Sequence, residues 1–341
     1  MTAGAELAAL AAAVPDAVVA RLAAARSVLA VGHENPDADA LGAALAVALL
    51  VEARGGHATV AVSDGAPALY AFLPGVENVR TDPEPGMTYD LVVLCDCGDL
   101  SRAGPIRERN PALFATTTVL AIDHHTSNDG TGDLAWIDPG AAATCEMVAL
   151  LAVRLGVPLT TGDGDLAAAL TAGIVMDTAT FAHPNATART LRVAAALVEA
   201  GAPLSDISRR LYRTKPDAQL ALFGRVLARL QRHADGLVVA STLELADLAA
   251  TGALSEHSEG IIDLLAQSES AEVALLLKEK EGETRLSVRT KAGGVDATIL
   301  CGTWGGGGHA RAAGASLLLP LAEARAAVLP VAERLAKAVV R

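Results

Sequence analysis

Short apolar runs of β type alternate with Ala- and Leu-rich helical stretches through the first 155 residues of the chain. The apolar runs lie at 27–31, 58–62, 91–95 and 118–122, and the helical stretches include 41–53 and 145–155. Strands that alternate with helices are typical of βαβ units, whose strands run parallel in one sheet. The sequence therefore predicts an α/β fold that begins with a parallel β-sheet flanked by helices.

The pattern changes after Asp235. Before it we expect further helices at 165–176, 187–200 and 204–213, and then a long helical connector from Asp217 to His233. After it, apolar stretches predict strands at 237–243, 272–278, 285–289 and 315–319, with a Gly-rich segment before the last strand and a helix after it. A chain of 341 residues also exceeds what a single hydrophobic core serves. We therefore expect a first domain over 1–212, a helical linker over 213–235 and a smaller α/β domain over 236–341.

The N-terminal segment and the cysteines indicate in which cellular compartment the protein is expected. The first 25 residues contain Glu6 and Asp16 and no early Lys or Arg, which predicts one amphipathic helix and not a signal peptide. No stretch approaches the ~18 apolar residues that a membrane span needs. The cysteines form neither a disulfide framework nor a CxxC pair, so we expect small core thiols and a cytoplasmic protein. They are Cys95, Cys97, Cys145 and Cys301.

The formal net charge of the chain is −12. Binding of long nucleic acid draws its affinity from Lys and Arg that neutralise many phosphates, so this charge argues against such a partner. Aromatic residues make up only 3% of the chain, and stacking platforms for single strands are therefore scarce. A small anion held at one cationic point remains compatible with the sequence, whereas a long nucleic acid or a membrane is not expected.

Asp and His residues follow the apolar runs directly. His33, Asp37 and Asp39 come after the first run, Asp96 after the third, and Asp123, His124 and His125 after the fourth. A further group begins at Asp177, after the apolar stretch 172–176. The carboxyl ends of parallel strands meet at one edge of a sheet, which is where ligand sites form in open α/β folds. We therefore expect these side chains to converge on one crevice.

Carboxylates and imidazoles brought so close together would repel or desolvate one another without cations. An oxygen-rich ligand set with one or two histidines suits Mn²⁺ or Mg²⁺ better than Zn²⁺, and six ligands imply two ions. The neighbours His124 and His125 must point in different directions, which suggests that one binds metal and the other meets substrate. A single Asp after a strand is often a helix cap, and Asp39 could cap a helix that begins at Leu41. The combination of several such groups favours the metal interpretation.

Taken in order, these motifs resemble those of the DHH phosphoesterases: His33-Glu34-Asn35-Pro36-Asp37-Ala38-Asp39, the Asp96 stretch, Asp123-His124-His125 and Asp177-Thr178. The segment from Gly305 to Gly314 resembles the signature of the DHHA1 domain. The resemblance implies a DHH catalytic domain followed by a DHHA1 substrate-binding domain. The two-domain length is similar to that of NrnA-type enzymes. The resemblance implies that these hydrolyse short oligoribonucleotides (nanoRNA), 3′-phosphoadenosine 5′-phosphate (pAp) and, in some members, cyclic di-AMP or linear di-adenylates.

The resemblance also implies roles for single residues. One metal would take His33, Asp37 and Asp96, and the other would take Asp39, Asp96, His124 and Asp177, with two Mn²⁺ ions or Mg²⁺ in their place. Asp123 would orient the adjacent histidines, and His125 would donate to the scissile phosphate. The implied reaction is metal-assisted hydrolysis, in which a hydroxide near Asp96 attacks phosphorus in line.

One departure from the family pattern follows Asp177. Relatives often have Gly where this chain has Ala179, so we expect the local turn to avoid positive φ. Phe181 is interpreted as a core residue and not as a base-stacking group. Arg102 is a candidate phosphate or ribose partner, with a buried ion pair as the alternative.

The Gly-rich segment is interpreted as a substrate clamp. Its backbone N–H groups can approach phosphate oxygens closely, and His309 adds a side-chain donor; a flexible loop is the alternative. Arg289, at the end of a predicted strand, is a further candidate for phosphate or ribose, unless it is a solvated strand-end charge. The clamp residues are Gly306, Gly307, Gly308 and His309.

Three other functions compete with this interpretation. A DHH-type inorganic pyrophosphatase would share the metal ligands, but resemblance associates those enzymes with a different C-terminal domain. A RecJ-like exonuclease would need a basic channel and additional domains. A non-catalytic nucleotide sensor would not need the full ligand set. The preferred nucleotide and the oligomeric state, with a homodimer as one option, stay open.

Overall fold

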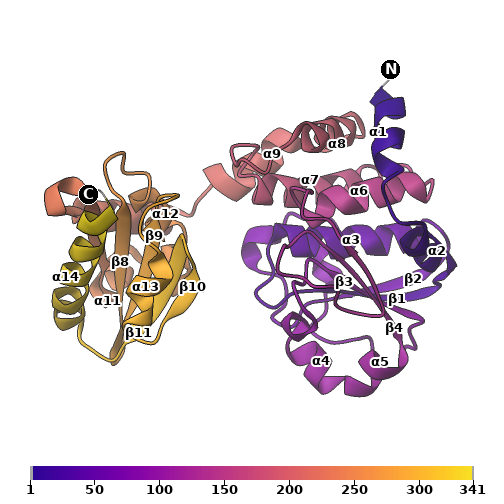
Figure 1. The fold of residues 1–341 in the computed structure, drawn as a ribbon. Helices are drawn as coiled ribbons and strands as arrows, with labels where there is room; N and C mark the ends of the chain where they lie inside the picture. The colour runs from indigo at the N-terminus through magenta and orange to yellow at the C-terminus, as the bar shows by residue number, and fades with distance from the viewer. Residues whose placement is uncertain (1–2, 340–341) are drawn as a thin grey trace. The chain divides into compact units, whose positions relative to one another are not determined.

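The computed structural model describes residues 3–339. The chain divides after Thr214 into two compact units, each with its own hydrophobic core (Figure 1). We call them the first unit and the second unit.

The first unit contains a five-stranded parallel sheet in the order β2-β1-β3-β4-β5, which confirms the expected parallel sheet. The sequence pattern missed its short edge strand β5, which pairs with β4. The strands are β1 (Ser27–Gly32), β2 (His57–Ala61), β3 (Leu91–Cys95), β4 (Thr118–Asp123) and β5 (Leu134–Ile137). The apolar runs are continuous because both faces of this sheet are buried: Val93 packs on one side and Leu94 on the other.

Helix α3 (Ala38–Glu52) lies between the sheet and the helices α6 (Thr144–Arg154) and α7 (Asp165–Asp177) (Figure 1). Nearly all of α3 is buried, which explains why it is apolar all round. The helices α8 (Ala188–Glu199) and α9 (Leu204–Ser208) pack against α7, and a π-helical turn, Arg209–Arg213, follows α9. The short helices α4 (Pro105–Arg109) and α5 (Pro111–Thr116) lie at the opposite face of the sheet.

The N-terminal segment forms two helices and not the single helix that we expected: α1 (Ala3–Ala11) and α2 (Asp16–Ala24). Pro15 separates them, because a proline disfavours helical backbone at the residue before it and is compatible with a helix start. No single helix of the described part of the chain is long and apolar enough to cross a membrane. The bent pair of these two helices passes that test only by length and composition.

The second unit contains a six-stranded mixed sheet in the order β10-β11-β9-β8-β7-β6, in which only β7 and β8 pair in parallel. One face carries α10 (Asp217–Ala228), α11 (Leu245–Thr251) and α12 (Ile261–Leu265), and the other carries α13 (Ala297–Gly302) and α14 (Leu321–Val339). The strands are β6 (Gln231–His233), β7 (Val238–Leu243), β8 (Val273–Lys280), β9 (Glu283–Thr290), β10 (Gly307–His309) and β11 (Ala312–Leu317).

Two expectations for this part of the chain need correction. The helix expected from 217 to 233 ends at Ala228, and residues 231–233 form a strand. It is not a free connector, because Leu222 and Val226 pack into the core of the second unit beside Val239. The strand expected at 315–319 lies at 312–317, since it pairs with β9 and with the end of the Gly-rich segment.

Candidate active site

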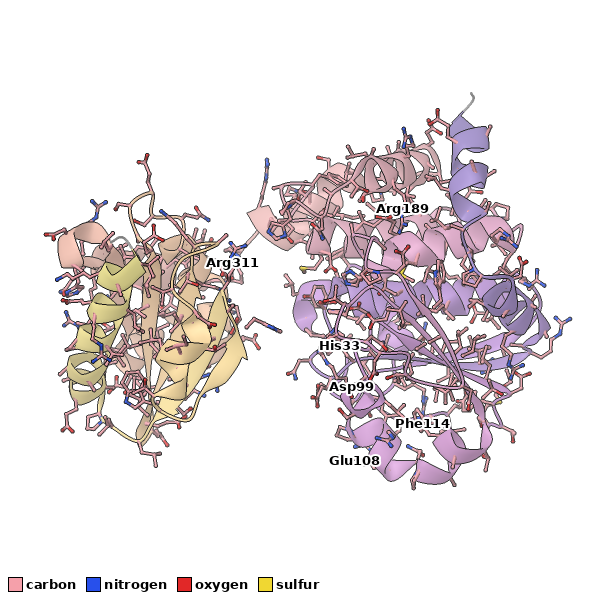
Figure 2. The ribbon with its side chains drawn as sticks, viewed as in Figure 1. His33, Asp99, Glu108, Phe114, Arg189 and Arg311 are labelled. Atoms are coloured by element: carbon pink, nitrogen blue, oxygen red, sulfur yellow. The ribbon has the colours of Figure 1, made fainter. Side chains whose placement is uncertain are left out.

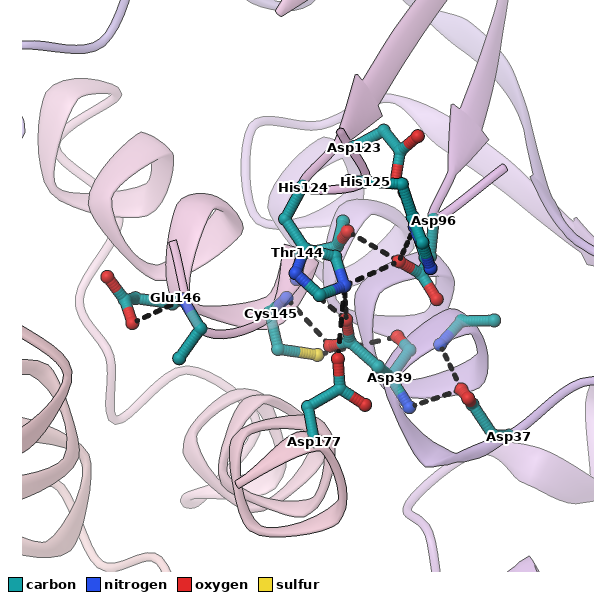
Figure 3. Close-up of polar contacts among 12 residues, drawn as sticks. Asp37, Asp39, Asp96, Asp123, His124, His125, Thr144, Cys145, Glu146 and Asp177 are labelled. Atoms are coloured by element: carbon teal, nitrogen blue, oxygen red, sulfur yellow. Dashed lines mark hydrogen bonds and ion pairs between the residues drawn. The ribbon is translucent and has the colours of Figure 1, made fainter. Parts of the chain in front are cut away.

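The structure brings eight predicted residues of the first unit together at the carboxyl edge of its sheet, and Figure 3 labels all of them except His33. They follow β1, β3 and β4, as expected, but the last of them ends helix α7 and not a strand. They are His33, Asp37, Asp39, Asp96, Asp123, His124, His125 and Asp177.

His33, Asp37 and Asp96 form a first cluster, whose ligand atoms lie within 4.8 Å of one another. The His33 Nε2 atom is 3.6 Å from Asp96 Oδ2 and 3.9 Å from Asp37 Oδ1. Its other ring nitrogen, Nδ1, lies 2.7 Å from the Glu34 carbonyl oxygen, which can only accept. Nδ1 therefore carries the hydrogen, and the Nε2 lone pair faces the two carboxylates, as in a metal-binding histidine.

Asp39, His124 and Asp177 form a second cluster. The His124 Nε2 atom is 3.0 Å from Asp177 Oδ2, 3.4 Å from Asp96 Oδ1 and 3.9 Å from Asp39 Oδ2. This buried nitrogen has no hydrogen-bond partner in the described part of the chain, although three carboxylates surround it (Figure 3). A cation between the nitrogen and these oxygens would satisfy all of them, so the residues present fit a metal ion.

The electrostatics of the two clusters favour added positive charge. Burial raises the pKa of Asp39, and the neighbouring carboxylates of Asp96 and Asp177 raise it further. Burial opposes protonation of His124, but the carboxylates of Asp177, Asp39 and Asp96 raise its pKa to about 10. Crowded carboxylates of this kind repel one another and stabilise cations in their midst.

The N-terminus of helix α6 holds two of these carboxylates in place. Asp39 Oδ2 accepts a hydrogen bond from the Thr144 amide at 2.6 Å, and Asp39 Oδ1 accepts one from the Cys145 amide at 2.9 Å. The Thr144 hydroxyl donates to Asp96 Oδ1 at 2.9 Å. Free amides at a helix N-terminus bind anions well. The sequence did not indicate that Thr144 and the Cys145 amide hold these carboxylates, because a Thr at the start of an apolar helix is a weak signal.

Asp37, and not Asp39, caps helix α3. Asp37 Oδ1 accepts from the amides of Asp39 at 2.9 Å and Ala40 at 3.0 Å, and the helix begins at Ala38. Asp39 lies in the first turn and is fully buried. The cap orients the Asp37 carboxylate toward His33, so the capping and ligand interpretations of this residue are compatible.

Asp123 is fully buried and holds the ring of His125. His125 Nδ1 lies 2.8 Å from Asp123 Oδ1, and Asn128 Nδ2 donates to Asp123 Oδ2 at 2.8 Å. Burial alone would raise the pKa of Asp123, but these contacts lower it. In turn, the hydrogen bond to Asp123 raises the pKa of His125. The orienting position expected for Asp123 is thus present, and Asn128 is a further partner that the sequence did not suggest.

The turn after Asp177 contradicts our expectation about its backbone. Ala179, Thr180 and Phe181 have φ values of 47°, 57° and 63°, so three non-glycine residues adopt the left-handed region. This conformation is costly for residues with a Cβ atom, and here it is stabilised by local hydrogen bonds. The Thr180 amide donates to the Val175 carbonyl at 2.9 Å, and the Phe181 amide donates to Thr178 Oγ1 at 2.9 Å. Phe181 packs against the core of the first unit, as expected.

Arg102 lies next to His33, whose position is labelled in Figure 2. Arg102 Nη2 is 3.2 Å from His33 Nδ1, but both nitrogens carry hydrogens when Nδ1 donates to Glu34, so this contact is not a hydrogen bond in that tautomer. Among residues 3–339 no carboxylate oxygen lies within 4.0 Å of this guanidinium, so the alternative of a buried ion pair is wrong. Asp99 instead accepts from the Ser101 amide at 2.6 Å.

The predicted clamp residues lie in the second unit and form strand β10 and the turn before it. Gly306 and Gly308 are required by packing, because a Cβ atom at either would lie 2.2 Å or 2.5 Å from a carbonyl oxygen of β11. Only Gly307 and Gly305 face open space. Packing alone therefore accounts for the glycines at 306 and 308, and the substrate clamp stays a prediction.

Arg289 and His309 share one face of the second sheet. His309 is the register partner of Ala312, which is in turn the register partner of Arg289. His309 is exposed, and Arg289 is one-third exposed. Arg289 Nε donates to Asp263 at 2.9 Å, so this arginine is held by an ion pair and is not a freely solvated charge.

Comparison with known proteins agrees with this fold. The model of the DHH family, N-terminal domain, matches residues 27–174, and the model of the DHHA1 domain matches residues 238–338. The chain belongs to the DHH family of phosphoesterases, in the group that carries a C-terminal DHHA1 domain. This assignment confirms the resemblance to the motifs described above.

Several proteins with similar sequences or structures have descriptive names. The bifunctional oligoribonuclease and PAP phosphatase NrnA of Thermus thermophilus is 34% identical over 288 residues, which cover 84% of this chain and 82% of that protein. The protein of the same name from Bacillus subtilis is 28% identical over 290 residues, with 84% and 87% covered. The crystal structure of an exopolyphosphatase-related protein from Bacteroides fragilis shares the fold, with a TM-score of 0.85, 21% identity and coverage of 96% and 97%.

Proposed function

We propose that this chain hydrolyses short oligoribonucleotides and pAp, using two metal ions held by the two clusters, with Asp96 between them as a ligand to both. The observation that carries the proposal is the position of Asp96, which presents Oδ2 to His33 and Oδ1 to His124. The names of the Thermus and Bacillus relatives support the substrate class.

In the proposed site, the metal ions when bound would polarise the scissile phosphate and activate water. His33, Asp37 and Asp96 would hold one ion, and Asp39, Asp96, His124 and Asp177 the other. The amides of α6 would hold the Asp39 carboxylate in place at the site. Mn²⁺ is the ion that we propose, because imidazole ligands suit it better than Mg²⁺.

His125 is the proposed donor to the phosphate. Its Nδ1–H is held by Asp123, and this carboxylate favours the protonated ring. Nε2 of the same ring then carries a hydrogen that can be donated to a phosphate oxygen, where negative charge grows in the transition state. The His125 side chain is 38% exposed, so it is accessible to a substrate.

The competing functions are weaker on specific grounds. The match of the DHHA1 domain to residues 238–338 counts against a DHH-type pyrophosphatase, which resemblance associates with another C-terminal domain. The net charge of −12 counts against a RecJ-like exonuclease acting on long strands. The presence of every predicted ligand at one edge counts against a sensor without turnover. A cytoplasmic location, a homodimer and cleavage of cyclic di-AMP stay predictions.

A substrate panel with Mn²⁺ tests the proposal. We expect turnover of RNA 2-mers to 5-mers and of pAp, little turnover of RNA longer than 20 nucleotides, and no turnover in excess EDTA. The panel should include pApA, cyclic di-AMP and pyrophosphate. Preferential hydrolysis of pyrophosphate, or equal rates on long RNA, would replace the proposed function with one of its competitors.

A further inference from the structure

Two cations face each other across strands β8 and β9 of the second unit. Lys278 and Arg285 are register partners in this antiparallel pair, so their side chains lie on the same face of the sheet. Among residues 3–339, neither has a carboxylate oxygen within 4.0 Å. Like charges directly opposite each other destabilise a pair of strands. An anion bound between them would remove this repulsion.

The surroundings of Lys278 make its charge costly. The residue is half-buried, and its Nζ donates to Ser258 Oγ at 3.2 Å. Burial lowers the pKa of Lys278, and Arg285 and Lys280 lower it further, whereas Glu259 raises it. A partly desolvated ammonium beside a guanidinium gains strong charge-assisted hydrogen bonds when it meets a phosphate.

The strand beside Arg285 leaves room for a ligand. Arg285 is exposed, and its register partner on β11 is Ser316, which is also exposed. The next pair on this face joins Ser287 to Gly314. These residues are small, so no large side chain of theirs covers the face beside Arg285.

Arg289 lies on the same face of β9, four residues further along the strand. At ~3.4 Å per residue, this places its Cα atom about 14 Å from that of Arg285. Arg289 is also held by its ion pair with Asp263, so its guanidinium stays at its own end of β9. Lys278 and Arg285 therefore suit a different phosphate from the one expected beside Arg289 and His309.

We propose that Lys278 and Arg285 form a second phosphate-binding subsite, which binds an additional phosphate of a short oligoribonucleotide. The inference rests on the proposed function for its choice of ligand. Only a substrate with several phosphates would reach both sets of cations, so the subsite would favour RNA of a few nucleotides over shorter substrates. RNA dimers and pAp are too short to use this subsite.

Equilibrium binding tests the subsite without turnover. Fluorescein-labelled RNA 2-mers and 5-mers are titrated with the full chain in EDTA, and anisotropy is followed at several salt concentrations. We expect Arg285→Gln to weaken binding of the 5-mer roughly tenfold, as loss of a hydrogen bond to a charged group does. The log–log salt slope should fall by about 0.7 for the lost charge. Binding of the 2-mer should stay within twofold.

Lys337→Gln is the matched control, because it removes an exposed cation from α14, which packs on the other face of the sheet. An equal loss for this control, or no loss for Arg285→Gln, would overturn the proposal. Lys278→Gln changes a half-buried residue and could destabilise the protein, so thermal unfolding of this variant is measured as well. The proposal is judged on Arg285→Gln, which changes an exposed residue. If inorganic phosphate binding depends on Arg285 while 5-mer binding does not, the site holds free phosphate and the proposal is wrong. Absence of RNA cleavage with Mn²⁺ would instead defeat the proposed function, and the anisotropy result would stand.

Discussion

At the residue scale, Asp96 faces three histidines from its two carboxylate oxygens. Oδ2 faces His33, and Oδ1 lies 3.4 Å from His124 and 3.5 Å from His125 Nδ1. Its backbone has a φ of 60°, a region that Asp tolerates better than most residues. The side chain is 2% exposed and is held by the Thr144 hydroxyl. Its orientation therefore depends on three separate parts of the chain.

We expect Asp96→Ala to reduce kcat by on the order of 10³-fold or more, because both proposed ions would lose a ligand. The measurement is steady-state hydrolysis of an RNA trimer at saturating Mn²⁺. Asp99→Ala is the control: it follows the same strand, lies outside both clusters and should keep near-normal turnover. An Asp96→Ala protein with a tenth of wild-type kcat would rule out the two-metal assignment.

At the element scale, close approach of helices shapes the site. A Cβ atom at Gly173 of α7 would lie 2.4 Å from Asp39 Oδ1 and 2.4 Å from Cys145 Sγ. Helix α7 can therefore approach α3 and α6 closely only because this position has no side chain. The packing of three helices and the position of a proposed metal ligand depend on the same glycine.

We expect Gly173→Ala to displace Asp39, lower Mn²⁺ affinity at least tenfold and reduce the free energy of unfolding by about 1–3 kcal/mol, as overpacking does. Isothermal titration with Mn²⁺ and urea unfolding measure the two effects. Gly224→Ala in α10 is the control, because its Cβ atom would meet nothing within 4 Å and Ala favours helix. Unchanged Mn²⁺ affinity in Gly173→Ala would show that Asp39 is not a ligand.

In the second unit, a buried carboxylate at the start of helix α11 makes the stability of the fold depend on pH in the acid range. Asp247, fully buried at the start of α11, contacts Arg229 and lies 2.8 Å from Arg225 Nε. Burial would raise the pKa of Asp247, but hydrogen bonds from the two arginines and from the Glu244 amide lower it to about 2. A lowered folded-state pKa stabilises the fold above pH 4, and this stabilisation is lost as pH falls from about 4 to about 2.

We expect Asp247→Asn to lower the free energy of unfolding by about 2 kcal/mol at pH 7. The difference from wild type should shrink as pH falls from about 4 toward 2, because the wild-type carboxyl then becomes protonated as well. Urea unfolding of both proteins at pH 7, 4 and 3 measures this difference. A difference that stays constant across this range would show that the carboxylate charge is not what stabilises α11.

At the scale of the whole molecule, the proposed metal site and the proposed Gly-rich clamp belong to separate units. The proposed metal ligands all lie before Thr214, and the Gly-rich segment with Arg289 lies after it. Each unit has its own core, so a substitution in one is not expected to disturb the folding of the other. Effects on binding and on metal chemistry should therefore be separable.

We expect His309→Ala to weaken productive binding of pAp and RNA dimers by roughly 1.5–3 kcal/mol and to leave Mn²⁺ affinity unchanged. Hydrolysis of bis-p-nitrophenyl phosphate should be almost normal, because that substrate has no nucleotide for the second unit to bind. kcat/KM is compared on the two kinds of substrate. Equal losses on both, or none on either, would show that this segment is structural.

The sequence by itself determined the α/β class, the parallel sheet and the set of residues at its carboxyl edge. An apolar run indicates a buried strand from neighbouring residues alone. Polar residues that directly follow a strand must lie at its end. The sequence shows glycines at 306 and 308, but it does not show why glycine is needed there. The reason is that the backbone of β11 lies against both positions.

Only the tertiary structure decided which partners hold these residues. Thr144 and Cys145 contact Asp39 from more than a hundred residues away, and Asn128 holds Asp123 through a loop without a motif. The left-handed turn at Ala179 is stabilised by hydrogen bonds to Val175 and Thr178, which outweigh the local preference of the sequence. The like-charged pair of Lys278 and Arg285 exists only through strand register. Contacts between distant segments depend on packing, and no local pattern of residue types encodes them.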